Sequence, residues 1–213
     1  MKTLAFALMV AVGALVGQAE TTVSNWADLL TAVSTASDGD VIILAAGDYT
    51  VVDSGVTLSH GVTVRGATGN PADVTITDAV SGKRAFTITH PDARIEALTI
   101  SGTGMGNGSN DQQGGHMSLS AGTVSNCVIE GGKVSSGTGL RGLGGNVYMT
   151  GGVVEDSILR AGWIGREGKG GNVYMTGGVV RRCRILEGEA SNSAGIYCVK
   201  GENEKTLLGC VSC

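Results

Sequence analysis

The stretch GGNVYMTGGVV occurs twice in this chain, at residues 144–154 and again, without a single difference, at residues 170–180. Identity over so long a stretch is typical of repeat proteins, in which each unit buries its apolar side chains against the next. The stretch therefore predicts a repetitive fold, and the rest of the chain can be aligned outward from it.

The repeat continues beyond the two identical copies as segments that alternate apolar and polar residues. The first segment is 95–100, and equivalent segments follow at 124–129, 154–159, 180–185 and 207–212. Such alternation is the pattern of a half-buried β-strand, whose side chains point to opposite faces in turn. Equivalent positions then form three inward rows: Ile95, Val124, Val154, Val180 and Leu207; Leu98, Cys127, Ser157, Cys183 and Cys210; and Ile100, Ile129, Leu159, Ile185 and Ser212.

The repeated stretch adds further rows of equivalent side chains. Tyr148 and Tyr174 are predicted to point outward and to stack on neighbouring units. His116, Asn146 and Asn172 are predicted to form a stacked polar row at a turn, with their side chains bonded to the backbone. The inward rows on either side of the tyrosines are Phe86, Met117, Val147 and Val173, and Ile88, Leu119, Met149 and Met175.

Charges and loops support the same alignment. All variation in length falls in one Gly-rich loop per unit, at residues 101–115, 131–145, 161–171 and 187–195. Opposite charges occupy equivalent outward positions of neighbouring units, and parallel strands about 4.8 Å apart would make them ion pairs. The three predicted pairs are Glu130 with Arg160, Glu155 with Arg181, and Asp156 with Arg182.

The first part of the chain completes the pattern. Trp26, Leu29, Leu30 and Val33 recur at helical spacing, which predicts a short amphipathic helix within residues 21–37 with Ser24 as its N-cap. The stretches GDVI, GDY and GVTVRG follow it, at residues 39–42, 47–49 and 61–66, before coils of the form GG-x-V-x-M…V-x-x-C-x-I. In these features the chain resembles right-handed parallel β-helix proteins of the pectin lyase-like superfamily, including secreted bacterial β-helix proteins and outer-membrane adhesins with Gly-Gly repeats.

The resemblance implies an all-β, right-handed parallel β-helix solenoid with a short N-terminal capping helix and coils of about 26–30 residues. It covers nearly all of the chain after Ala19. It is not specific for activity, because this fold carries lyases, hydrolases, esterases, adhesins and scaffolds.

Residues 1–19 have the pattern of a secretory signal, with Lys2, an apolar run and a small-x-small site that ends at Ala19. The apolar run is too short for a comfortable membrane span, and no other segment is long and apolar enough. We therefore expect cleavage near Ala19, a cap at residues 20–40, coils at 41–213, and a secreted or cell-surface protein. The last coil ends at Cys213 without a cap, so we expect it to be incomplete and covered by further chain or by a partner.

Composition excludes some classes of function. The net charge of −4 provides no basic surface for nucleic acid. The three histidines are dispersed, so neither a metal site nor a cofactor is expected. Of the five cysteines, those in the second inward row are expected to be buried free thiols, whereas Cys198 and Cys213 are less constrained and their redox state stays open.

Two classes of function remain open. The first is an exported, non-catalytic scaffold for adhesion or for binding a polysaccharide or cell-surface glycan, with Tyr148 and Tyr174 as a sugar-stacking surface helped by Arg160 and Arg184. The alternative is a carbohydrate-active enzyme, polysaccharide lyase-like or glycoside hydrolase-like, or the N-terminal fragment of one, whose catalytic residues the sequence does not identify. We favour the first, because the outward carboxylates are expected to be neutralised by arginines. A groove that held two unpaired carboxylates and an unpaired lysine or arginine would favour an enzyme.

Overall fold

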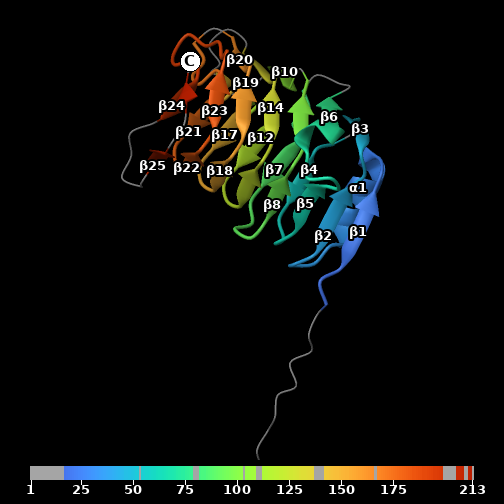
Figure 1. The fold of residues 1–213 in the computed structure, drawn as a ribbon. Helices are drawn as coiled ribbons and strands as arrows, with labels where there is room; N and C mark the ends of the chain where they lie inside the picture. The colour runs from blue at the N-terminus through green and yellow to red at the C-terminus, as the bar shows by residue number, and fades with distance from the viewer. Residues whose placement is uncertain are drawn as a thin grey trace, which may run out of the picture.

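The structure is a computed structural model that describes residues 17–52, 54–78, 82–102, 104–108, 112–136, 142–165 and 167–198, with the short strands at 205–208 and 211–212. Its strands wind into a parallel β-solenoid whose coils follow one another from the N-terminal to the C-terminal end (Figure 1). Three long sheets, named A, B and C here, surround one core. The predicted all-β parallel β-helix is therefore confirmed.

Each complete coil contributes one strand to each long sheet, and the sheets are entirely parallel. Sheet A contains β1 (Glu20–Val23), β2 (Val41–Leu44), β5 (Thr63–Gly66), β8 (Arg94–Glu96), β13 (Thr123–Ser125), β18 (Val153–Glu155), β22 (Gly178–Arg181) and β25 (Lys205–Leu208). Sheet B contains β3 (Gly47–Val51), β6 (Val74–Asp78), β9 (Thr99–Ser101), β14 (Val128–Glu130), β19 (Ile158–Arg160), β23 (Arg184–Leu186) and β26 (Val211–Ser212). Sheet C contains β4 (Val56–Leu58), β7 (Phe86–Ile88), β12 (Met117–Leu119), β17 (Val147–Met149), β21 (Val173–Met175) and β24 (Ile196–Cys198).

The strands pair in the register that the repeat predicts. The first inward row, from Ile95 to Leu207, pairs in sheet A, and the third, from Ile100 to Ser212, pairs in sheet B. Both rows of the repeated stretch pair in sheet C. In the second row the side chains are buried as far as Cys183, and Cys210 lies outside the described residues. Stacking of like apolar side chains therefore builds the core.

The Gly-Gly pair inside the repeated stretch turns the chain from sheet C into sheet A. A Cβ atom on Gly151 would collide with the Ser120 carbonyl oxygen of the preceding coil, so only glycine fits. Its neighbour Gly152 has a φ of +74°, in the left-handed region that side chains disfavour. Close coil-to-coil contact and backbone conformation thus both require glycine at this corner.

At the N-terminal end the structure differs from the predicted helix boundaries. The helix α1 (Trp26–Thr35) begins after Asn25, not after Ser24. Asn25 has the extended backbone of an N-cap, and its side chain accepts a hydrogen bond of 2.9 Å from the Asp28 N–H. The residues before it form β1, which pairs with β2. The helix covers the end of the core through buried Trp26 and Leu29, and the Trp26 ring meets Phe86 edge-on at 6.0 Å.

The Gly-rich loops also differ from the prediction, because they contain strands that stack from coil to coil. Sheet D consists of β10 (Gly104–Gly108), β15 (Lys133–Ser136) and β20 (Trp163–Ile164), and sheet E of β11 (Gln112–Gln113) and β16 (Gly142–Leu143). Single bridges continue both sheets into the next coil, from Trp163 to Glu189 and from Leu143 through Lys169 to Asn192. A short 3-10 helix, η1 (Pro71–Asp73), precedes β6. The loops therefore have a repeating structure of their own.

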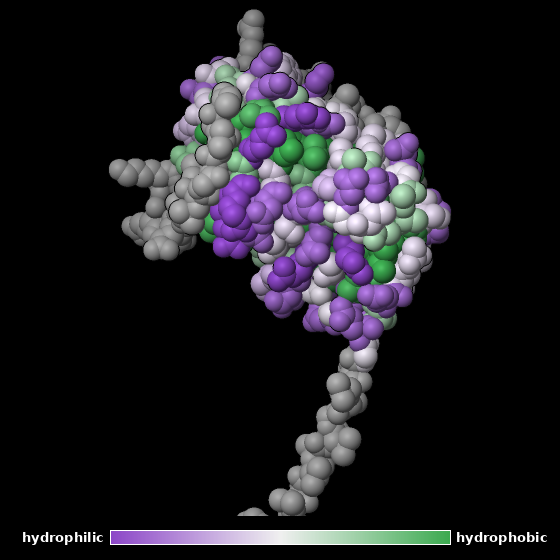
Figure 2. Space-filling view, viewed as in Figure 1, coloured by the Kyte–Doolittle hydropathy of each residue, from purple (hydrophilic) through white to green (hydrophobic). Residues whose placement is uncertain are grey.

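The outer surface in the view of Figure 2 is mostly hydrophilic, with smaller apolar areas between the polar residues. Among the residues that the structure describes, no helix has the length and apolar character needed to cross a membrane. Residues 1–16 of the predicted signal and Cys213 lie outside the described residues.

Candidate functional site

A cleft of about 490 Å³ opens on the side of the solenoid where the loops stack. This volume lies within the range of small-molecule sites in proteins. We call it the Trp163 cleft, after the half-buried tryptophan in its wall. The described residues that line it are Lys133, Ala161, Gly162, Trp163, Glu187 and Glu189.

Three of these residues occupy one position on three successive coils. Lys133 pairs with Trp163 in sheet D, and Trp163 pairs with Glu189 through a parallel bridge. The next residues of the two strands, Val134 and Ile164, are 0% and 4% exposed and point into the interior. Because side chains alternate faces along a strand, Lys133 and Trp163 point outward.

The corner before sheet D brings a second acidic residue into the same cleft. Strands β19 and β23 of sheet B are each followed by a residue with positive φ, Ala161 at 52° and Glu187 at 51°. Non-glycine residues rarely adopt this conformation, and here it turns the chain sharply from sheet B into the cleft wall. The turn places Glu187 beside the row of Lys133, Trp163 and Glu189.

The floor of the cleft is held by buried asparagine side chains. Asn172 is 0% exposed, and its Oδ1 accepts hydrogen bonds from the Gly162 N–H at 3.1 Å and from Asn146 Nδ2 at 2.7 Å. Asn146, also 0% exposed, accepts a bond of 2.8 Å from the Gly132 N–H. The predicted polar row is therefore confirmed as a buried, hydrogen-bonded ladder, and it fixes the backbone beneath Trp163.

His116 continues this ladder toward the N-terminal end. It is 2% exposed, and its Nε2 lies 2.8 Å from the Glu130 carbonyl oxygen. The side chain is enclosed by the turn and bonded to the backbone, which supports its predicted structural position.

The charged residues of the cleft differ from those elsewhere on the solenoid. Among the described residues, Lys133, Glu187 and Glu189 take part in no ion pair. The predicted pairs on sheets A and B are all formed: Arg160 lies 2.6 Å from Glu130, Arg181 lies 2.6 Å from Glu155, and Arg182 lies 2.7 Å from Asp156.

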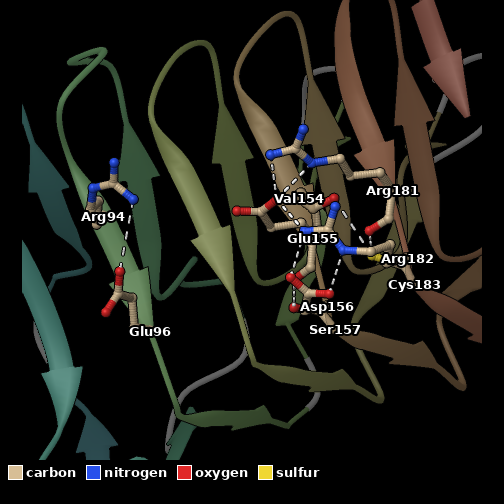
Figure 3. A network of polar contacts seen from close by, with 9 residues as sticks. All are labelled: Arg94, Glu96, Val154, Glu155, Asp156, Ser157, Arg181, Arg182 and Cys183. Atoms are coloured by element: carbon tan, nitrogen blue, oxygen red, sulfur yellow. Dashed lines mark hydrogen bonds and ion pairs between the residues drawn. The ribbon is translucent and has the colours of Figure 1, made fainter. Parts of the chain in front are cut away.

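Figure 3 shows the ion pairs of sheet A and its corner, where Arg181 contacts Glu155 and Arg182 contacts both Glu155 and Asp156. The hydrogen bond from Arg182 lowers the pKa of Asp156 below its ordinary value of 3.8. The same contact raises the pKa of Arg182. Glu155 and Asp156 are therefore neutralised by arginines of the neighbouring coil, and neither lines the Trp163 cleft.

The structure does not bring the four predicted binding residues together. Tyr148 and Tyr174 lie on the outer face of sheet C, whereas Arg160 and Arg184 lie on sheet B. Arg160 is held by Glu130. None of the four lines the Trp163 cleft.

The tyrosines form a longer stack than predicted. The Tyr148 and Tyr174 rings are parallel within 4° at 5.6 Å, and Tyr197 continues the stack at 5.5 Å and 4°. Tyr174 is therefore covered on both ring faces. Since sugars stack on the flat face of an aromatic ring, this arrangement favours the covering role for the tyrosines over the sugar platform. Lys169 closes the row, with its Nζ 3.1 Å from the Tyr197 hydroxyl.

Other polar or reactive side chains in the described part of the chain give less support for a functional site. No group of three or more His, Cys, Asp or Glu side chains there could hold a metal ion. Cys127 and Cys183 are buried, as predicted, and Cys198 is exposed. Burial raises the pKa of Cys127 to about 12, so this thiol is inert.

The lining residues were missed from sequence although a signal for them exists. The spacing from Lys133 to Trp163 equals that from Ile129 to Leu159 in the core, and the spacing from Trp163 to Glu189 equals that from Leu159 to Ile185. Lys133, Trp163 and Glu189 therefore each lie four residues after an inward residue of sheet B, namely Ile129, Leu159 and Ile185. Extending the alignment past sheet B would have placed the three in one row.

Comparison with known proteins found similarity among solved structures. No family model matches the chain, and no curated protein matches it. Among solved structures, an alginate lyase from Paenibacillus sp. str. FPU-7 is similar, with 14% sequence identity and a TM-score of 0.40 over 91% of this chain and 95% of that chain. A similarity at this level says nothing about the activity of this chain, and the resemblance to the pectin lyase-like superfamily stays a prediction.

Proposed function

We propose that this protein is a glycan-binding β-solenoid and that the Trp163 cleft is its binding site. One observation carries the proposal: a half-buried tryptophan lines a cleft of about 490 Å³ beside three charged side chains that make no ion pair among the described residues. An indole ring offers an apolar face to the C–H face of a sugar. Carboxylates and an ammonium group can accept from and donate to its hydroxyl groups.

The preformed floor supports the same role. Asn172 anchors the backbone at Gly162, which directly precedes Trp163. Asn146 anchors it in the same way at Gly132, which directly precedes Lys133. A binding residue on a rigid element loses little conformational entropy when its ligand arrives. We propose that the site acts outside the cell, with residues 1–19 as a removed signal, residues 20–40 as a cap and the coils from residue 41 as the scaffold.

The second candidate is a carbohydrate-active enzyme that uses the same cleft. The observation that favours it is the presence of Glu187, Glu189 and Lys133 in one cleft without ion pairs among the described residues. This goes against the expectation that arginines neutralise the outward carboxylates, and it is the groove that would favour an enzyme. In a hydrolase, one carboxyl would protonate the leaving oxygen while the other acted on water or on the sugar. In a lyase, Lys133 would be the candidate base. Either reaction requires binding at the Trp163 cleft.

Binding is tested by isothermal titration of an oligosaccharide panel against matched aromatic substitutions. Trp163→Ala should abolish binding, Trp163→Phe should restore part of it, and Tyr148→Ala should leave it unchanged. Loss of affinity on removing an aromatic stacking partner is commonly about tenfold or more. Binding that survives in Trp163→Ala but not in Tyr148→Ala would move the site to sheet C and reject the proposal.

Catalysis is tested on the same panel by measuring new reducing ends and the absorbance of unsaturated products. An enzyme should lose turnover in Glu187→Gln or Glu189→Gln while the unfolding midpoint stays unchanged. Binding without product in the unmodified protein, with every polysaccharide of the panel that binds, would leave the scaffold role as the function.

A further inference from the structure

The charge of the Trp163 cleft is unbalanced. Of the charged lining residues that the structure describes, Glu187 and Glu189 are acidic and Lys133 is basic. The two arginines in the strands of sheet B do not correct this, because Arg160 is engaged by Glu130 at 2.6 Å and Arg184 does not line the cleft. A ligand in the cleft therefore meets more negative than positive charge.

A second cleft extends the first along the same strands. Its volume is about 360 Å³, and it shares Trp163 and Glu189 with the first. Its other described lining residues are uncharged: Ile164, Gly165, Ala190 and Ser191. Glu189 thus lies where the two clefts meet. Among the described lining residues of the second cleft, it is the one that carries a charge. A ligand longer than one sugar would pass this carboxylate on its way from one cleft to the other.

We propose that this groove selects glycans that carry protonated amino groups, such as oligosaccharides of glucosamine, over neutral and acidic glycans. The inference rests on the proposed glycan-binding function. An ammonium group donates charge-assisted hydrogen bonds to carboxylates, and these are stronger than the bonds of a neutral hydroxyl. It is also attracted to the face of an indole ring. A uronic acid would meet repulsion from Glu187 and Glu189, with Lys133 alone to attract it.

The test compares three probes by isothermal titration at about pH 6, where a sugar amine carries its proton. The probes are a glucosamine oligosaccharide, its fully N-acetylated counterpart of the same length and linkage, and an oligogalacturonate. We expect the glucosamine probe to bind about threefold to tenfold more tightly than the acetylated one, as one or two exposed charge pairs allow. The preference should shrink with added salt.

Substitutions assign the preference to the two carboxylates. The double variant Glu187→Gln/Glu189→Gln should bind the glucosamine and acetylated probes equally. Glu96→Gln, which removes a carboxylate from sheet A outside the cleft lining, is the matched control and should retain the preference. Lys133→Gln should strengthen binding of the glucosamine probe or leave it unchanged.

The outcomes separate the two proposals. Equal or tighter binding of the acetylated probe, lost in Trp163→Ala, would overturn the amino-sugar preference and leave the glycan-binding function standing. Tightest binding of oligogalacturonate, dependent on Lys133, would do the same. If none of the three probes and no member of the oligosaccharide panel binds, the proposed function fails and the preference fails with it.

Discussion

Replacing Asn172 by alanine should destabilise the protein and loosen the Trp163 cleft together. The side chain is fully buried and makes three hydrogen bonds, with the Gly162 N–H, the Leu186 carbonyl and the Asn146 amide. Alanine cannot replace any of them. The Gly162 N–H then loses its partner in the interior, while the Leu186 carbonyl, which also accepts from the Ala161 N–H, is less severely affected.

The size of the effect follows from the number of groups left unpaired. A buried donor or acceptor without a partner costs about 1–3 kcal/mol. Asn146 keeps two bonds from its amide, to the Ile129 carbonyl at 3.2 Å and the Arg160 carbonyl at 3.0 Å. One fully buried and one partly buried backbone group then give a loss of about 2–4 kcal/mol. At a typical dependence on denaturant, this corresponds to a shift of about 1–2 M in the urea midpoint.

The assay is equilibrium unfolding in urea, followed by tryptophan fluorescence and by far-ultraviolet circular dichroism. The chain has two tryptophans, Trp26 in the capping helix and Trp163 in the cleft, so fluorescence reports on both regions. Asn192→Ala is the matched control, since Asn192 lies in the next coil, is exposed and has no side-chain hydrogen bond among the described residues. Its effect should stay below about 0.5 kcal/mol. If the two substitutions shift the midpoint equally, the buried amide ladder does not stabilise the solenoid as argued.

Three further predictions concern other parts of the ladder and its surroundings. His116→Asn should change the unfolding free energy by less than about 1 kcal/mol in urea, because an amide can donate to the same carbonyl, whereas His116→Leu should cost about 1–3 kcal/mol. In the native protein at about pH 8, iodoacetamide should spare Cys127, whose pKa burial raises to about 12, and should modify it only after denaturation; peptide mass spectrometry before and after denaturation checks this. Asp156→Asn should lower the melting temperature at neutral pH but not at about pH 2. The contact with Arg182 lowers the pKa of Asp156 in the folded state. The contact therefore stabilises the fold above pH 3.8, and this stabilisation is lost as the pH falls through the lowered pKa.

The core was predictable because stacking imposes the same requirement on every coil. A residue such as Val154 pairs with its equivalents on both sides, Val124 and Val180, so the sequence repeats wherever the structure does. The ion pairs were predictable for the same reason, since parallel pairing without offset brings outward residues of equal position together. Stacking also predicted the tyrosine row, but not its extension to Tyr197.

The N-terminal boundary was not predictable in the same way. Residues 20–23 form a strand too short for a pattern to emerge, and they are β-strand only because β2 offers an edge. Ser24 and Asn25 can each cap a helix. The choice of Asn25 depends on which side chain reaches the Asp28 N–H, and this follows from where β1 ends. Such boundaries are decided by tertiary contacts that a local pattern does not contain.

The Trp163 cleft escaped prediction because the requirement that makes the core repeat is absent there. The row of Lys133, Trp163 and Glu189 keeps its register through backbone bonds alone, so its outward side chains are free to differ from coil to coil. An alignment of the coils that looks for identical or similar residues does not detect such a row. Yet the difference is what makes a site, since three identical residues would give a uniform ladder like that of the tyrosines. In this fold the repeated spacing shows which outward residues of successive coils lie side by side. A ligand can be recognised where the side chains at these equivalent positions differ.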